Sequence, residues 1–199
     1  SPEEILGWED YDYLKFVHPE FQEKVKIQAE KKQKGYKDVD NHYELKVITK
    51  DSKVKWVELF SRSLYYSGRL GDFITVLDIT EKRESEKKYR YLFEKSPNMI
   101  CVLDIDGEII DVNNAFLEFM QLNKEDYIGY KIFKTPFFNL EETPIIKQKF
   151  SEISSKNSIK SFELQLKIPD KGESWLRIEA SKIESEFKDL IIAIMEDIT

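Results

Sequence analysis

The side chains that most often carry catalysis or metal binding are few in this sequence. It contains one cysteine, Cys101, and two histidines, His18 and His42. A lone thiol forms no intrachain disulfide and supplies no ligand set for a structural zinc. Cys101 lies in the apolar run 99–103, so we expect a buried, inert thiol, because a reactive one needs a partly exposed, electropositive setting. The sequence predicts no catalytic residue, no metal site and no enzyme in this segment.

Composition narrows the class of protein further. Of the 199 residues, 38 are acidic and 31 basic, and the net charge of −7 argues against a nucleic-acid-binding surface. The seven glycines form neither Gly-x-Gly nor a P-loop, so we expect no phosphate-binding loop. No apolar run approaches the roughly 20 residues that span a bilayer, and no signal peptide is visible. We therefore expect a cytoplasmic fragment of a longer protein, since the chain begins with Ser1.

The two halves of the chain repeat each other. Trp56 and Trp175 lie 119 residues apart, and the same interval separates Asp78-Ile79-Thr80 from Asp197-Ile198-Thr199. The segment 43–47 matches 162–166 at this offset as well. A period this long indicates duplicated domains rather than a solenoid of short repeats.

The second copy shows the expected architecture. Residues 99–103 and 108–112 are predicted strands, and Asp106-Gly107 between them is typical of a tight hairpin turn. Asn113 is predicted to be the N-cap of a short helix. Further short helices and then three strands follow. Because strands and helices are grouped, we expect an α+β fold with an antiparallel sheet and helices on one face.

The first copy is predicted to be incomplete. It has no counterpart of residues 99–112, so we assign 1–80 to an N-terminally incomplete domain, 81–95 to a helical connector and 96–199 to a complete domain. Without two strands its sheet has an unpaired edge. Either the missing strands lie upstream or another segment covers the edge. The first copy's long helix is expected at 19–34, with strands at 43–50, 54–63 and 72–77.

The connector is predicted to be a single stiff helix. Thr80 can cap it, Glu84 and Lys88 form a favourable i, i+4 pair, and no glycine or proline interrupts it before Pro97. A stiff helix can carry a movement between domains, which a Gly/Ser coil cannot. The alternative is a solvated helix that only spaces the two domains.

The order of these pieces, present twice, resembles the PAS domain with its C-terminal PAC motif, as in bacterial and archaeal sensor histidine kinases. The likeness covers nearly the whole chain and implies in each copy a five-stranded antiparallel sheet, whose concave face, roofed by helices, can hold a small ligand. It also implies that Asp78, Thr80, Asp197 and Thr199 lie where the last strand passes into an outgoing signalling helix. The matching segments are 3–7, 17–20, 49–56, 102–115 and the two Asp-Ile-Thr triplets.

A ligand in the second copy would be expected to contact large apolar side chains. The alternative is that these side chains fill the space completely. No cofactor is predicted: light-sensing relatives hold flavin through a cysteine in a helix, and haem-binding relatives use a histidine in the long helix. The predicted lining is Phe116, Met120, Phe133, Phe150, Phe162, Leu164, Leu176, Ile178, Ile192 and Ile194.

Three functions stay open from the sequence. The first is the sensory, dimerising segment of a two-component sensor histidine kinase acting in a phosphorelay. The second is a cofactor-binding receptor carrying haem or flavin, and the third is a protein-interaction module of a non-kinase regulator. We expect a homodimer formed through helices or sheet faces, and a kinase or other effector domain after Thr199. We expect neither nucleic-acid binding nor a membrane span in this segment.

Overall fold

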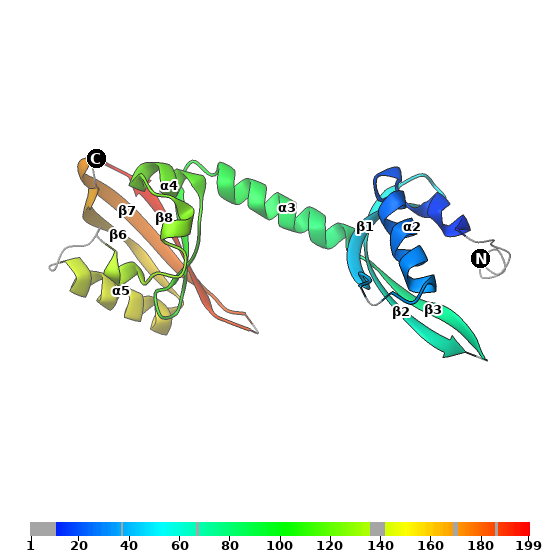
Figure 1. Ribbon diagram of the computed structural model, residues 1–199. Helices are drawn as coiled ribbons and strands as arrows, with labels where there is room; N and C mark the ends of the chain where they lie inside the picture. The colour runs from blue at the N-terminus through cyan, green and yellow to red at the C-terminus, as the bar shows by residue number, and fades with distance from the viewer. Residues whose placement is uncertain (1–10, 37, 67, 136–141, 169–170, 186) are drawn as a thin grey trace. The chain divides into compact units, whose positions relative to one another are not determined.

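The computed structural model describes residues 11–36, 38–66, 68–135, 142–168, 171–185 and 187–199 (Figure 1). The helix expected at 3–7 lies outside these residues. The chain divides into two compact units, residues 1–88 and 89–199. Helix α3 (Thr80–Lys95) belongs to both, because the boundary falls inside it. Among the helices that the structure describes, none combines the length and apolar character needed to cross a membrane.

The first unit is a three-stranded antiparallel sheet with one helix against it. Side chains alternate along a strand, so Tyr43, Leu45 and Val57 turn inward together and form a small core with Val25 of the helix. The strand order is β1-β2-β3. The elements are η1 (Asp12–Phe16), α2 (Pro19–Gln33), β1 (His42–Ile48), β2 (Val54–Tyr66) and β3 (Arg69–Asp78).

Strand β3 forms the edge of this sheet. Within the described residues it pairs only with β2. The side chains of Phe73, Ile74, Val76 and Leu77 are each more than half exposed, on both faces of the strand. This is the unpaired edge that the absence of two strands predicts.

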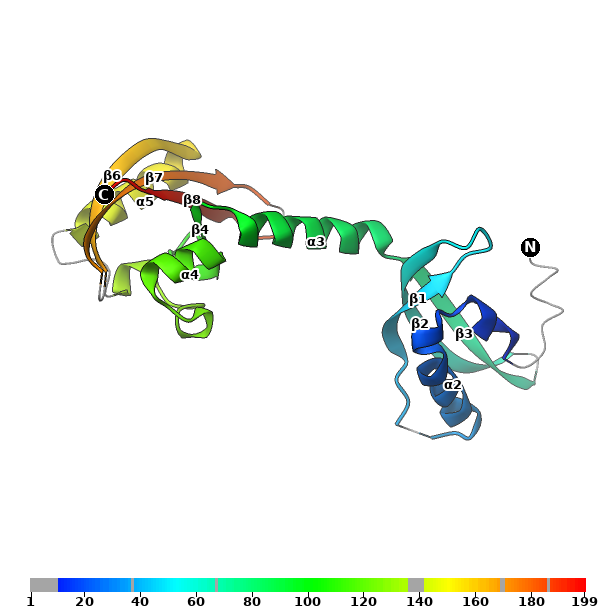
Figure 2. The same cartoon turned by 90° about the horizontal axis from the view of Figure 1, so that it is seen from above.

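The second unit is a five-stranded antiparallel sheet with helices against one face (Figures 1 and 2). The predicted α+β architecture with a five-stranded sheet is confirmed for this unit. The strand order is β5-β4-β8-β7-β6. The elements are β4 (Met99–Asp104), β5 (Ile109–Val112), α4 (Asn114–Met120), η2 (Lys124–Asp126), η3 (Ile132–Lys134), α5 (Glu142–Lys156), β6 (Ser158–Ile168), β7 (Gly172–Ile183) and β8 (Leu190–Asp197).

The β4–β5 hairpin turns at the predicted Asp106-Gly107. Gly107 has φ +79°, and a Cβ at this position would lie 2.5 Å from the Phe133 ring, so glycine meets both a conformational and a steric need. The buried Asp104 carboxylate holds the turn by accepting the backbone N–H groups of Asp106 (2.9 Å) and Glu108 (2.7 Å).

The two sheets share one pairing register over three strands. Leu45 pairs with Val57 and Val57 with Asp78 in the first unit. Their counterparts 119 residues later are paired in the same way, Leu164 with Leu176 and Leu176 with Asp197. The offset found in the sequence is therefore also the offset of the backbone pairing.

Candidate functional site: a cavity and the helix tied to its wall

A cavity of about 80 Å³ lies inside the second unit. Its floor is the inner face of the sheet, where Ala180 of β7 and Ala193 of β8 are directly opposed, and two methyl side chains leave room that larger residues would fill. Helices α4 and α5 supply the wall. The lining is Cys101, Leu103, Phe116, Met120, Ile132, Ile146, Lys149, Phe150, Ile153, Phe162, Leu166, Ile178, Ala180, Ile191, Ala193 and Met195.

The two lining residues that carry heteroatoms in their side chains, methionines aside, are Cys101 and Lys149. Burial, reinforced by the charge of Asp111, raises the pKa of the Cys101 thiol to about 12, so it stays neutral and unreactive. The Lys149 side chain is about one-third exposed, and its ammonium lies 3.6 Å from the Glu152 carboxylate. The alkyl part of Lys149 therefore lines the cavity while its charge is paired outside.

Five of the ten predicted lining residues line this cavity: Phe116, Met120, Phe150, Phe162 and Ile178. Leu164 and Leu176 are buried in the same core but away from the cavity. Phe133 packs edge-on against Phe150 with ring centroids 5.3 Å apart, also away from the cavity.

The prediction for Ile192 and Ile194 is wrong. Strand β8 turns Ile191, Ala193 and Met195 inward, whereas Ile194 is 38% exposed on the opposite face. An uninterrupted apolar strand has no hydrophobic alternation, so the sequence does not reveal which set of side chains faces inward. Pairing with β4 and β7 decides it.

Sequence reasoning also missed lining residues outside the strands. Ile146 and Ile153 come from α5 and Ile132 from η3. The helical spacing of Ile146, Phe150 and Ile153 was the available signal, because it places all three on one face.

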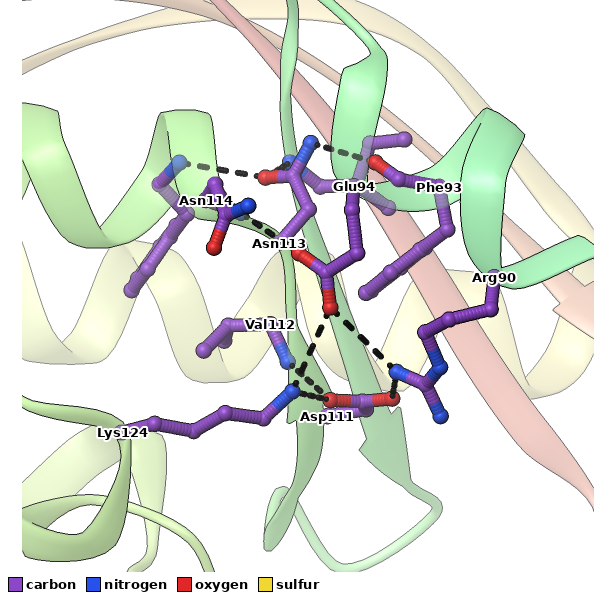
Figure 3. A network of polar contacts seen from close by, with 10 residues as sticks. Arg90, Phe93, Glu94, Asp111, Val112, Asn113, Asn114 and Lys124 are labelled. Atoms are coloured by element: carbon purple, nitrogen blue, oxygen red, sulfur yellow. Dashed lines mark hydrogen bonds and ion pairs between the residues drawn. The ribbon is translucent and has the colours of Figure 1, made fainter.

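Asn113 joins the cavity wall to the end of α3 (Figure 3). Its side chain is fully buried, and the amide makes four hydrogen bonds. The Oδ1 atom accepts the backbone N–H of Ile100 (2.8 Å) and of Phe116 (3.1 Å), the latter as the predicted N-cap of α4. The Nδ2 group donates to the carbonyls of Phe93 (3.0 Å) and Asn98 (2.9 Å). The amide's hydrogen-bonding capacity is fully used, which fixes α3, β4 and α4 together.

A charged cluster beside Asn113 reinforces this junction (Figure 3). Asp111 of β5 pairs with Arg90 of α3 (2.8 Å) and Lys124 of η2 (2.5 Å). Glu94 of α3 pairs with Arg90 (3.4 Å) and Lys124 (3.7 Å) and accepts the backbone N–H of Asn114 at the start of α4 (3.0 Å). Two cations and two carboxylates thus bind the last turns of α3 to the start of α4.

Within this cluster, Asp111 and Arg90 favour each other's charged forms. Burial alone would raise the pKa of Asp111, but hydrogen bonds and charge from Lys124 and Arg90 outweigh it and lower that pKa. The same contact with Asp111 raises the pKa of Arg90. Since Phe116 and Met120 of α4 line the cavity, a shift of α4 would strain bonds that end on α3.

The two Asp-Ile-Thr triplets make the same hydrogen bonds in their separate units. Thr80 Oγ1 donates to Asp78 (2.7 Å) and accepts the N–H of Trp56 (3.0 Å). Thr199 Oγ1 donates to Asp197 (2.7 Å) and accepts the N–H of Trp175 (3.0 Å). In both triplets the Thr backbone N–H also bonds the Asp carboxylate, at 3.0 and 3.1 Å.

Each Asp of these triplets is held as a carboxylate. The Lys55 ammonium and the Thr80 donors lower the pKa of Asp78. The Thr199 hydroxyl and N–H, helped by Lys171, lower the pKa of Asp197. The predicted relay residues therefore occupy equivalent positions at the ends of β3 and β8.

Helix α3 starts directly from the first triplet. Thr80 is its first residue, and the Arg83 guanidinium one turn later lies 3.9 Å from the centroid of the Trp56 ring and pairs with Glu44. Trp175, the counterpart of Trp56, is 44% exposed. The first tryptophan thus packs against a helix of its own unit.

The second unit is thus an α+β domain in which an antiparallel sheet and the helices on its inner face enclose a small apolar cavity. A family profile described as "PAS domain" matches residues 97–199. The chain belongs to the PAS domain family, and its second unit is a PAS sensory domain.

The chain is also similar to individual proteins. Sensor protein TdiS of Thauera aromatica is 25% identical over 120 residues, which is 58% of this chain and 22% of that protein, so the chain spans about a fifth of this curated relative. The PAS domain of an HTR-like protein from Haloarcula marismortui is 29% identical, with TM-score 0.49, covering 59% of this chain and 97% of that one. A PAS domain from Colwellia psychrerythraea is 22% identical, with TM-score 0.51, covering 58% and 98%; this likeness concerns the fold.

Proposed function

We propose that the chain is the sensory and relay segment of a signal-transduction protein, a two-component sensor histidine kinase, and that it contains two PAS units in tandem. The segment itself carries no catalysis, and it acts as a homodimer. The kinase domain belongs to another part of the parent protein. The similarity to a sensor protein of which the chain spans only a fifth supports this division of labour.

The tandem arrangement is supported by equivalence at two levels. The β1–β2–β3 and β6–β7–β8 registers agree at an offset of 119 residues. The hydrogen bonds around Thr80 and Thr199 agree group by group. On this proposal, the first unit is the C-terminal half of a PAS domain, which contains the PAC motif. A complete domain would have two further strands, which would continue the sheet from the β3 edge.

The observation that carries the relay role is the anchoring of α3 at its two ends. The helix begins on the Asp78–Thr80 junction and ends on the Asn113 amide and the Asp111 cluster. Each end is fixed by hydrogen bonds to groups at a strand or helix terminus. A change at either end alters how the helix starts or stops, and the signal passes along a stiff element.

A kinase fusion tests this function. The chain, joined through Thr199 to the dimerisation and catalytic core of a sensor histidine kinase, is assayed for autophosphorylation. Asp197→Asn weakens the hydrogen bonds between Asp197 and Thr199 at the end of β8. A change of about 1 kcal/mol in the coupling between the sensory segment and the kinase core alters the active population about fivefold. Asp189→Asn is the matched control, because this carboxylate also pairs with a lysine, Lys182, at 2.7 Å, but away from the junction. Equal rates for the two variants would refute the relay role.

A further inference from the structure

We propose that the cavity of the second unit binds a small, uncharged, apolar molecule no larger than a single six-membered ring. This inference rests on the proposed sensory function and names the class of ligand. Three features of the wall support it: its chemistry, its volume and the pair of alanines that creates the space.

The chemistry of the described wall selects against polar ligands. Its single charged residue, Lys149, directs its ammonium to Glu152. Its single cysteine is buried and neutral. The β4, β7 and β8 backbones that form the floor are engaged in strand pairing. A polar or charged molecule would give up hydrogen bonds to water and recover few in return.

The volume limits the size of the ligand. An engineered apolar cavity of about 150 Å³ stays dry and binds benzene or xenon, and the present cavity, at about 80 Å³, is roughly half that size. Pockets for drug-sized molecules and cofactors measure about 300–1,000 Å³. Haem and flavin are therefore too large for this cavity. A noble-gas atom or a short hydrocarbon fits, and a single six-membered ring fits if α5 is slightly displaced.

The space has an identifiable origin. Ala180 and Ala193 face each other across β7 and β8, and the positions 119 residues earlier hold Ser61 and Ile74. Replacing Ala193 by the isoleucine that the first unit carries is therefore a substitution already found in this strand pair. It fills the cavity from its floor and leaves every residue of α4 and of the charged cluster on α3 unchanged.

The test measures binding of benzene and of xenon to the 199-residue chain, by calorimetry and by ¹²⁹Xe chemical shift. We expect saturable binding of one molecule per chain, weakened at least about tenfold by Ala193→Ile, because the added side chain occupies the space. Ala29→Ile, an equal addition in α2 of the first unit, should bind like the unchanged chain. Ala180→Val is the second filling variant, and circular dichroism checks that both fold.

Benzoate is the contrasting probe. Binding of benzene without benzoate supports a neutral apolar ligand. Tighter binding of benzoate would overturn the inference in favour of an anion held by Lys149, and failure of both benzene and xenon would show that the cavity stays empty. If the chain binds benzene or xenon but Asp197→Asn leaves the autophosphorylation of the kinase fusion unchanged, the relay function is refuted and the ligand proposal is not. The failure of one proposal can therefore be told apart from the failure of the other.

Discussion

Replacing Asn113 by leucine tests the tie between α3 and the cavity wall directly. Leucine has the same branched arrangement of heavy atoms as asparagine, with a somewhat larger volume, but its side chain neither donates nor accepts hydrogen bonds. The variant leaves four backbone groups without their partner: the N–H groups of Ile100 and Phe116 and the carbonyls of Phe93 and Asn98.

The expected loss follows from these four bonds. A typical hydrogen bond contributes about 1 kcal/mol net, and leaving its buried partner unsatisfied costs about 1–3 kcal/mol. Some of the freed groups will reach water once the turn relaxes, so we expect a total of about 4 kcal/mol. That is a large part of the roughly 5–15 kcal/mol by which domains are stable.

Hydrogen exchange read by mass spectrometry measures this loss unit by unit. A loss of about 4 kcal/mol lowers the protection of the most stable amides in β4 and β8 by about a thousandfold. Peptides from β1 and β2 serve as an internal reference. Asn123→Leu is the matched control, since this asparagine is exposed and its side chain donates to the Asp126 carboxylate (3.2 Å) and not to the backbone of another element. We expect a change within about 0.5 kcal/mol.

Two results would refute the reasoning about Asn113. One is a loss below about 1 kcal/mol, which would mean that the four bonds are replaced without cost. The other is faster exchange in β4 and α4 while residues 90–95 keep their protection, which would separate α3 from the cavity wall.

Three further perturbations follow from the same contacts. Gly107→Ala should lower the free energy of urea unfolding by about 3 kcal/mol, because φ is +79° and the new Cβ would lie 2.5 Å from the Phe133 ring. Gly172→Ala should lower it by only about 1 kcal/mol, because φ is similar (+87°) but the described structure leaves open space for the Cβ. Asp111→Asn should cost about 1–2 kcal/mol at pH 7 and progressively less as the pH falls below the unfolded value. The folded-state pKa is lowered, so the carboxylate's contribution is present above the unfolded value of about 3.9 and is lost as the pH falls through the folded value. Thr80→Val should speed exchange in the first turn of α3 about fivefold, because it removes the hydroxyl that ties the start of the helix to Asp78 and to the Trp56 N–H, whereas Thr75→Val at an exposed position of β3 should not.

Each of these has an outcome that would contradict it. Equal losses for the two glycine variants would mean that the aromatic ring moves aside freely. A cost of Asp111→Asn that does not change with pH would contradict an ionised cluster. Unchanged exchange after Thr80→Val would show that α3 starts independently of the junction.

The sequence by itself determined the local features. The 119-residue repeat, the Asp106-Gly107 turn and the Asn113 cap all depend on residues close together in the chain. The alternation of Phe162 with its neighbours likewise fixed the inward face of β6. In each case the side chain or the backbone conformation acts on groups only a few residues away.

Tertiary structure decided the features that depend on distant segments. Strand β8 is apolar on both faces, so only its pairing with β4 and β7 turned Ala193 inward and Ile192 outward. The charges of Arg90, Asp111 and Lys124 become a cluster only when α3, β5 and η2 meet. Such contacts arise from packing between segments, which residue spacing along the chain does not encode.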